Sequence, residues 1–218
     1  MKLKKLINYC LKHIRPSVPF IIGVGGPSGV GKSFFAHEIL KKELENRDKK
    51  VLVISLDSFF ETRHTRDAIG SEWDERHVRI DELRRVFKSI VQGKQCIQTR
   101  RRDRTKKNLI FWTIFPAKYD IIMLEGLYAI SSDPRLGNLS EFVDLPIYIT
   151  AKKTLVKQWR FQQEKQKKDA RTQAAMNKHW YQGIVPDTVH NVKPSKKNAL
   201  VVLRKTKNHE YIITQFPR

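Results

Sequence analysis

Short apolar runs alternate with segments of helical periodicity along most of the chain. The runs that predict buried strands are residues 20–24, 51–56, 119–126, 143–149 and 199–203, with an edge strand at 211–214. The segments that predict helices are residues 32–46, 80–92 and 152–181. Strands that alternate with helices favour right-handed crossovers. We therefore expect an α/β fold: a doubly wound, mostly parallel sheet with helices on both faces.

The N-terminal segment and two basic segments suggest how the chain is organised. Residues 1–19 contain a helical repeat interspersed with lysines, and we expect an amphipathic helix packed on one domain of residues 20–218. A helix lying on a membrane surface is the alternative. Residues 97–115 predict a β-hairpin arm, and this segment and residues 152–181 are the two candidates for a small basic lid.

A glycine-rich motif follows the first predicted strand and opens the first predicted core helix. It comprises Gly26, Pro27, Ser28, Gly29, Val30, Gly31, Lys32 and Ser33, and it fits the P-loop pattern G-x-x-x-x-G-K-[ST]. Glycines let backbone N–H groups wrap around a phosphate, Lys32 would reach the β- and γ-phosphates, and Ser33 would ligate Mg²⁺. The sequence thus predicts a P-loop NTPase type of sheet that binds ATP and Mg²⁺, with Phe34 beside the nucleotide. A glycine turn that merely starts a helix is the alternative.

Length and cysteine content further limit the class of protein. A chain of 218 residues suits one domain, and its 2 cysteines are far apart and match no metal-binding spacing. No apolar run approaches the roughly 20 residues of a membrane span, and the N-terminus lacks the pattern of a signal peptide. We expect a cytoplasmic protein, and we leave open whether it forms a homo-oligomer.

The net charge of +21 favours anionic partners. The charge is densest at residues 100–107 and 165–168. Basic residues beside Phe111, Trp112 and Phe115 would allow single-stranded nucleic acid to bind by charge and stacking. The alternation of these aromatics instead fits a strand that packs on a core, so we rank a nucleic-acid partner below a small-molecule one.

Two acidic residues stand where strands of the predicted sheet end. Asp57 follows the second strand and Glu125 ends the third. Parallel α/β sheets bind ligands outside the carboxyl ends of their strands, which makes both acids candidate site residues. A strand-end turn for Asp57 and a capping or solvated acid for Glu125 are the alternatives.

Several motifs together resemble one family of kinases. They are residues 26–33, 55–60, 73–74, 119–126 and 192–199. Their order and spacing are similar to the uridine kinase/phosphoribulokinase superfamily, pantothenate-kinase-like members included, over about residues 20–204. The resemblance implies that Asp57 lies beside the acceptor hydroxyl and is the catalytic base, that Phe60 helps hold the acceptor, and that Glu125 lies near the metal.

The chain departs from that family at two points. Uridine kinases carry a Tyr-Asp-Phe segment and a histidine where this chain has Arg100-Arg101-Arg102-Asp103. Guanidinium groups suit carboxylate or phosphate, so we expect Arg102 to face an anionic or strongly polar acceptor. Phe60 and Trp73 would still stack on a nucleoside ring. The family's lid motif is also missing, and we expect Arg160 and Arg171 to reach the phosphates, a solvated basic helix being the alternative.

The sequence therefore predicts an ATP-dependent kinase that phosphorylates a hydroxyl of a small metabolite, with a nucleoside-, sugar- or pantothenate-like acceptor. The other classes left open are a nucleoside-monophosphate kinase and a P-loop NTPase that acts with nucleic acid. Guanylate kinases share the P-loop sequence, but their Ser-Arg-Pro-Pro element is missing here. His179 and the other histidines match no metal spacing, and we expect them to be packed or solvated.

Overall fold

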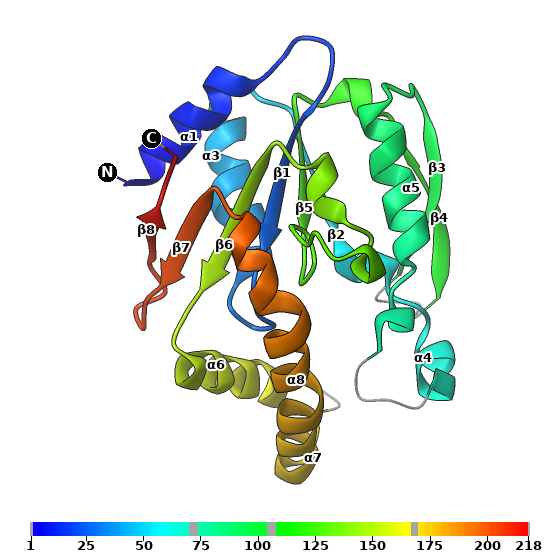
Figure 1. Ribbon diagram of the computed structural model, residues 1–218, viewed down its shortest axis with the longest axis vertical. Helices are drawn as coiled ribbons and strands as arrows, with labels where there is room; N and C mark the ends of the chain where they lie inside the picture. The colour runs from blue at the N-terminus through cyan, green and yellow to red at the C-terminus, as the bar shows by residue number, and fades with distance from the viewer. Residues whose placement is uncertain (1, 70–73, 104–107, 167–169, 218) are drawn as a thin grey trace.

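The computed structural model describes residues 2–69, 74–103, 108–166 and 170–217. Within these residues the central sheet has six strands in the order β2-β5-β1-β6-β7-β8 (Figure 1). Their bounds are β1 Phe20–Gly25, β2 Val51–Ser55, β5 Ile121–Glu125, β6 Leu145–Thr150, β7 Val201–Lys205 and β8 Tyr211–Gln215. All neighbours pair in parallel except β8, which runs antiparallel to β7 at the edge. The predicted α/β class, with a mostly parallel sheet, is confirmed.

Helical segments link these strands. The larger ones are α1 Lys2–His13, α4 Arg63–Ile69, α5 Ile80–Val91, α6 Lys153–Lys165 and α7 Gln173–Lys178. The helix after β1 is continuous through α2 Lys32–Phe34, a π-helical stretch at Phe35–Lys41 and α3 Lys42–Glu45. After α7 the chain stays helical through His179–Ile184, α8 Val185–Asp187, Thr188–Val192 and Lys193–Asn198. Short 3-10 turns occur at Leu56–Phe59, Glu75–His77, Pro116–Lys118, Pro134–Leu136 and Leu139–Phe142.

The two faces of the sheet bury separate apolar cores. Successive residues of β1 point to opposite faces, so Ile22 packs in one core and Ile21 in the other. The first core also receives α1, whose Leu6 and Cys10 side chains are fully buried. Burial raises the pKa of the Cys10 thiol to about 12, which keeps this cysteine protonated and unreactive.

The predicted hairpin forms a separate two-stranded sheet. Strands β3 Ile97–Arg102 and β4 Leu109–Ile114 pair antiparallel and lie alongside α5 (Figure 1). Ile97 and Ile114 at its base are buried in the second core with Phe87 of α5. The base of the hairpin is therefore packed on α5, which the expectation of a projecting arm did not include.

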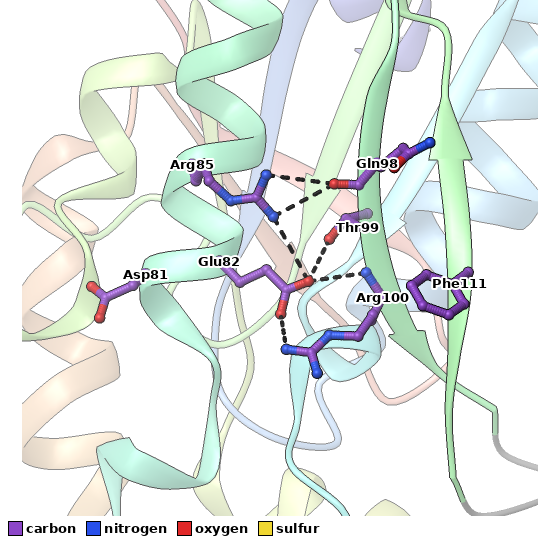
Figure 2. Close-up of a pocket in the computed structure, with 7 residues that line it drawn as sticks. All are labelled: Asp81, Glu82, Arg85, Gln98, Thr99, Arg100 and Phe111. Carbon is purple, nitrogen blue, oxygen red and sulfur yellow. Dashed lines mark hydrogen bonds and ion pairs between the residues drawn. The ribbon is translucent and has the colours of Figure 1, made fainter.

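Glu82 of α5 fixes the hairpin to the helix (Figure 2). Its carboxylate accepts hydrogen bonds of 2.9 Å from the Thr99 hydroxyl and 2.9 Å from the Arg100 backbone N–H. It also accepts bonds from the guanidinium groups of Arg100, at 3.2 Å, and Arg79, at 2.6 Å. Arg79 in turn donates to the carbonyls of Ser58 and Arg100, both at 3.1 Å. This network joins the segment after β2 to α5 and to the hairpin.

Candidate active site

The P-loop joins β1 to α2, and its backbone requires glycine at two points. Gly26 has φ +140, and a Cβ there would lie 2.3 Å from the Ile149 carbonyl oxygen of β6. Gly31 has φ +100, and a Cβ there would lie 2.6 Å from the Tyr211 hydroxyl oxygen. Residues other than glycine rarely adopt these φ values, and neither position has room for a Cβ atom. The loop is therefore fitted closely between its neighbours.

Two side chains brace the loop. Lys32 Nζ donates a 2.9 Å hydrogen bond to the Pro27 carbonyl, which closes the loop on itself. From the edge strand β8, the Tyr211 hydroxyl donates a 2.9 Å bond to the Gly31 carbonyl. Tyr211 also lies 180 positions from Gly31 in the sequence, so the last strand of the sheet supports its first loop.

A cleft of about 430 Å³ opens over the P-loop at the carboxyl ends of the strands. The predicted residues that line it are Ser28, Gly29, Gly31, Lys32, Ser33, Phe34, Asp57, Phe60, Glu125, Arg160 and Arg171. Gly26, Pro27 and Val30 belong to the loop but do not line the cleft. Trp73 lies outside the described residues, and so does the side chain of Arg102. The structure thus gathers candidates from segments more than a hundred residues apart.

Sheet topology explains why the two acids meet the P-loop. Strand β5 lies beside β1, and β2 lies beside β5. Glu125 ends β5 and Asp57 follows β2, so both carboxylates reach the edge of the sheet where the P-loop starts. The Ser55 hydroxyl donates a 2.5 Å hydrogen bond to Glu125 Oε1, which orients this buried carboxylate.

The electrostatics of the cleft centre on Lys32. Burial lowers the pKa of its ammonium group, while the carboxylates of Glu125 and Asp57 act in the opposite direction. A phosphate placed here would favour the charged ammonium form in the same way. Lys32 is thus held between acids at a point where an anionic ligand would strengthen its charge.

The helical segment after α7 adds a third acid that the sequence analysis missed. Asp187 is buried, and its carboxylate accepts hydrogen bonds from the Tyr128 hydroxyl at 2.8 Å and from Asn191 Nδ2 at 3.0 Å. Burial raises its pKa, against the effect of these bonds and of the Lys32 charge. No motif marks Asp187, because its place in the cleft follows from how the helix packs.

The side of the cleft facing Asp57 is built by the described residues between β2 and α5. Phe60 forms an isolated antiparallel bridge with Val78, and the Glu61 N–H donates a 2.8 Å bond to the His77 carbonyl. This pairing places His77, only 7% exposed, beside Phe60 in the cleft. Arg66 of α4 also lines the cleft, with its guanidinium carbon 5.7 Å from the centre of the Phe60 ring.

The basic helices supply the other wall. Arg160 of α6 lies against the P-loop, since a Cβ on Gly29 would be 3.2 Å from Arg160 Cβ. Arg171 lies near α7 and forms a 3.5 Å ion pair with the buried Glu164. His179 also lines the cleft, whereas the sequence suggested only a packed or solvated histidine.

The arginines of β3 have other partners. Arg100 binds Glu82, and the Arg101 guanidinium lies 5.6 Å from the centre of the Trp112 ring. Neither residue lines the cleft. Arg100 therefore belongs to the contact between the hairpin and α5, and Arg101 to a contact within the hairpin. The basic groups on the acceptor side of the cleft come from α4 and the turn at His77.

The donors present fit a nucleotide with its metal. Mg²⁺ prefers oxygen ligands and usually takes one or two from the protein and the rest from phosphates and water. The Ser33 hydroxyl and the Glu125 carboxylate are two such oxygens, and both line the cleft beside Lys32. A P-loop at the carboxyl end of a central parallel strand, with acids on neighbouring strands and arginines in the same cleft, defines a nucleotide-binding protein of the P-loop kinase class.

Sequence comparison gives the family. The model of the phosphoribulokinase/uridine kinase family matches residues 21–211, and the chain therefore belongs to this family. A pantothenate kinase of Rhodococcus jostii is 26% identical over 231 residues, which cover 91% of this chain and 71% of the relative. A uridine kinase of Saccharomyces cerevisiae is 28% identical over 213 residues, which cover 92% of this chain and 40% of the relative. The relatives are kinases of small metabolites.

Solved structures share the fold. A D-glycerate 3-kinase from Cryptococcus neoformans superposes with a TM-score of 0.71 at 13% identity, covering 99% of each chain. The phosphoribulokinase of Rhodobacter spheroides superposes with a TM-score of 0.67 at 17% identity, covering 94% of this chain and 77% of that one. In the described part of this chain, no helix has the length and apolar character needed to cross a membrane.

Proposed function

We propose that this protein transfers the γ-phosphate of ATP to a hydroxyl of a small, carboxylate-bearing alcohol. The observation that carries the proposal is the single cleft in which Lys32 and Ser33 of the P-loop face Asp57 and Arg66. Phosphoryl transfer requires positioning and charge neutralisation, and it requires a group that takes the hydroxyl proton. The cleft offers a residue for each of these needs.

On the nucleotide side, the P-loop N–H groups and Lys32 would bind the phosphates, and Ser33 and Glu125 would hold Mg²⁺. Bound Mg²⁺ supplies neutralisation of the phosphate charge. Arg160 and Arg171 line the same cleft and stabilise the charge that develops on the transferred group, because a guanidinium binds phosphate oxygens in a bidentate manner.

On the acceptor side, Asp57 takes the proton of the acceptor hydroxyl as that oxygen bonds to the γ-phosphorus. The bond from this phosphorus to the bridging oxygen breaks, and ADP leaves with the electron pair. Asp57 is exposed to the cleft at the end of its strand, which gives its carboxylate room to meet a substrate hydroxyl.

Two features support a carboxylate-bearing acceptor. The acceptor side of the cleft contains Arg66 and a partly buried phenyl ring, Phe60, which together suit an anionic group on a small apolar body. Pantothenate kinases are among the curated relatives, and pantothenate is a carboxylate with free hydroxyls. Uridine remains the second candidate, because a uridine kinase is also a relative.

A panel of acceptors tests the proposal. Purified protein with Mg·ATP is incubated with pantothenate, D-glycerate, uridine, cytidine, fructose or single-stranded RNA, and products are detected by the added mass of one phosphate. We expect a phosphorylated product from a carboxylate-bearing alcohol. ATP hydrolysis stimulated by RNA, with no phosphorylated small molecule, would contradict the kinase proposal, and efficient use of uridine alone would contradict the acceptor class.

Replacement of Arg66 tests how the acceptor is recognised. Arg66→Gln should raise the KM for the carboxylate acceptor by about 10- to 100-fold, since a charged hydrogen bond to a carboxylate contributes roughly 1.5–3 kcal/mol. The KM for ATP should stay near the wild-type value. Arg204→Gln is the matched control, because Arg204 is exposed on β7 and does not line the cleft. Equal acceptor KM values for both variants would rule out this role.

A further inference from the structure

A second cavity lies on the far side of the P-loop from the acceptor. It has a volume of about 330 Å³ and is enclosed by the end of β6, the start of α6 and the helical segment of residues 180–196. Small-molecule sites range from roughly 300 to 1,000 Å³, so this cavity has room for a small ligand. We refer to it as the α6–α8 cavity.

The walls of the α6–α8 cavity are mainly apolar. The side chains that form them are Val156, Trp180, Ile184, Val185 and Val189. Apolar side chains around an open space favour a ligand with an apolar body, because water gains few hydrogen bonds there. The cavity and the catalytic cleft share Ser28 and Ile184 as a common wall, and Asp57, Arg66 and His77 lie only on the cleft side.

One buried tyrosine side chain contributes a hydroxyl group to the wall. Tyr148 of β6 lines the cavity and is 2% exposed. Among the described residues, no hydrogen bond or ion pair involves its side chain. Burial alone raises its pKa to about 12, so the hydroxyl keeps its proton and acts as a donor. The hydroxyl oxygen itself is accessible, so the group can donate a hydrogen bond to a ligand oxygen placed in the cavity.

Three lysines and no acid occur among the described residues that line the cavity. Lys153, Lys193 and Lys196 are exposed at its rim, so their ammonium groups stay in water while their stems face the opening. This arrangement gives the rim a positive potential that favours an anionic group at the mouth. The three features together describe a site that is apolar inside, contains one hydroxyl donor and is cationic outside.

We infer that the α6–α8 cavity is a binding site for a small amphiphilic carboxylate, separate from the catalytic cleft. The apolar part of the ligand packs on Trp180 and Ile184. A carboxylate oxygen accepts the hydrogen bond from Tyr148, and the carboxylate charge interacts with Lys193 and Lys196. Because Ser28 forms part of the wall, the bound ligand touches the P-loop from behind.

Calorimetric titration of the full chain with octanoate tests this inference, with 1-octanol as the uncharged probe of the same length. We expect one octanoate per chain and weaker binding of 1-octanol. Tyr148→Phe should weaken octanoate binding about 2- to 10-fold, the effect of one lost hydrogen bond. Its melting temperature should not fall, because the lost hydroxyl has no partner in the described protein.

A pair of neighbouring lysines provides the matched control. Lys196→Gln should weaken octanoate binding about 2- to 5-fold, the effect of one exposed ion pair. Lys197→Gln should leave it unchanged, since Lys197 does not line the cavity. Ala151→Leu, which places a larger side chain in the wall, should abolish binding.

Three results would overturn the inference. The first is the absence of octanoate binding to the wild-type chain. The second is equal affinity in wild type, Tyr148→Phe and Lys196→Gln. The third is loss of all octanoate binding when a non-hydrolysable ATP analogue and Mg²⁺ saturate the cleft, which would place octanoate in the cleft. None of these measurements depends on kinase activity, so they stand apart from the proposed function.

Discussion

Tyr211 illustrates how a single residue remote in sequence shapes the P-loop. Its hydroxyl donates to the Gly31 carbonyl at 2.9 Å, and its ring lies 5.0 Å from the ring of Phe35. The Lys205 ammonium group lies 5.7 Å from the centre of the Tyr211 ring. The P-loop conformation therefore depends on contacts from β7 and β8 as well as on its own glycines.

Removal of this hydroxyl should loosen the loop without unfolding the protein. Tyr211→Phe keeps the ring packing and leaves the Gly31 carbonyl without its donor, so we expect the Kd for Mg·ATP to rise about 2- to 10-fold. Fluorescence titration with a labelled ATP analogue measures the change. Tyr181→Phe is the control, since Tyr181 is exposed and does not line the cleft. An unchanged Kd in Tyr211→Phe would show that the bond does not position the loop.

At single positions, the residues of the candidate site could be predicted where a sequence motif lies at the end of a predicted strand. The P-loop, Asp57 and Glu125 each lie at or just after the carboxyl end of a strand, and these three strands are neighbours in the parallel sheet. His77 and Asp187 could not be predicted in this way, because each reaches the cleft through a turn or a helix that no pattern marks. The predicted helical segment at residues 152–181 indicated that basic residues would cover the site, but not which of them face the cleft.

Among the elements, the hairpin and α5 show that a basic residue of a charged run can have its partner within the fold. The run Arg100-Arg101-Arg102 resembles a substrate-binding patch when read alone. In the structure Arg100 meets Glu82, a carboxylate 18 residues earlier whose partners cannot be identified from the helical stripe of α5. The strands themselves were predictable from their alternation, whereas their contact with α5 required three-dimensional information.

Glu82 should contribute to stability in a manner that depends on pH. Its burial disfavours the charged form, but hydrogen bonds from Thr99 and Arg100 and the charge of Arg79 outweigh this effect and lower its pKa. A lowered carboxylate pKa stabilises the fold above the unfolded-state value, and this stabilisation is lost as pH falls through the folded-state value.

Glu82→Gln should therefore lower the free energy of unfolding at pH 7 by about 1–3 kcal/mol, because buried donors lose a charged acceptor. The difference from wild type should shrink as the pH falls below 4.5, the usual pKa of this side chain. Urea unfolding at several pH values measures it. Glu45→Gln is the control, since Glu45 pairs with Lys41 at the protein surface. A pH-independent difference would argue against a role for the charge.

On the scale of the whole molecule, the fold places the chemistry at one edge of the sheet. The P-loop, Glu125 and Asp57 come from three strands that are neighbours in space, β1, β5 and β2. Helix α6 brings Arg160 to the cleft and Arg171 comes from the residues just before α7, while α4, which carries Arg66, lies on the other side (Figure 1). The net charge of +21 adds a long-range attraction for anionic nucleotides and acceptors.

The measurement that tests this account most directly is phosphoryl transfer by Asp57→Asn. With the acceptor found in the panel, single-turnover transfer from labelled ATP is followed alongside the Kd for Mg·ATP. We expect an unchanged Kd and a transfer rate about 10²- to 10⁴-fold below wild type, the effect of a lost general base. Asp81→Asn, an exposed acid that does not line the cleft, should transfer at the wild-type rate. Transfer by Asp57→Asn at the wild-type rate would contradict the account.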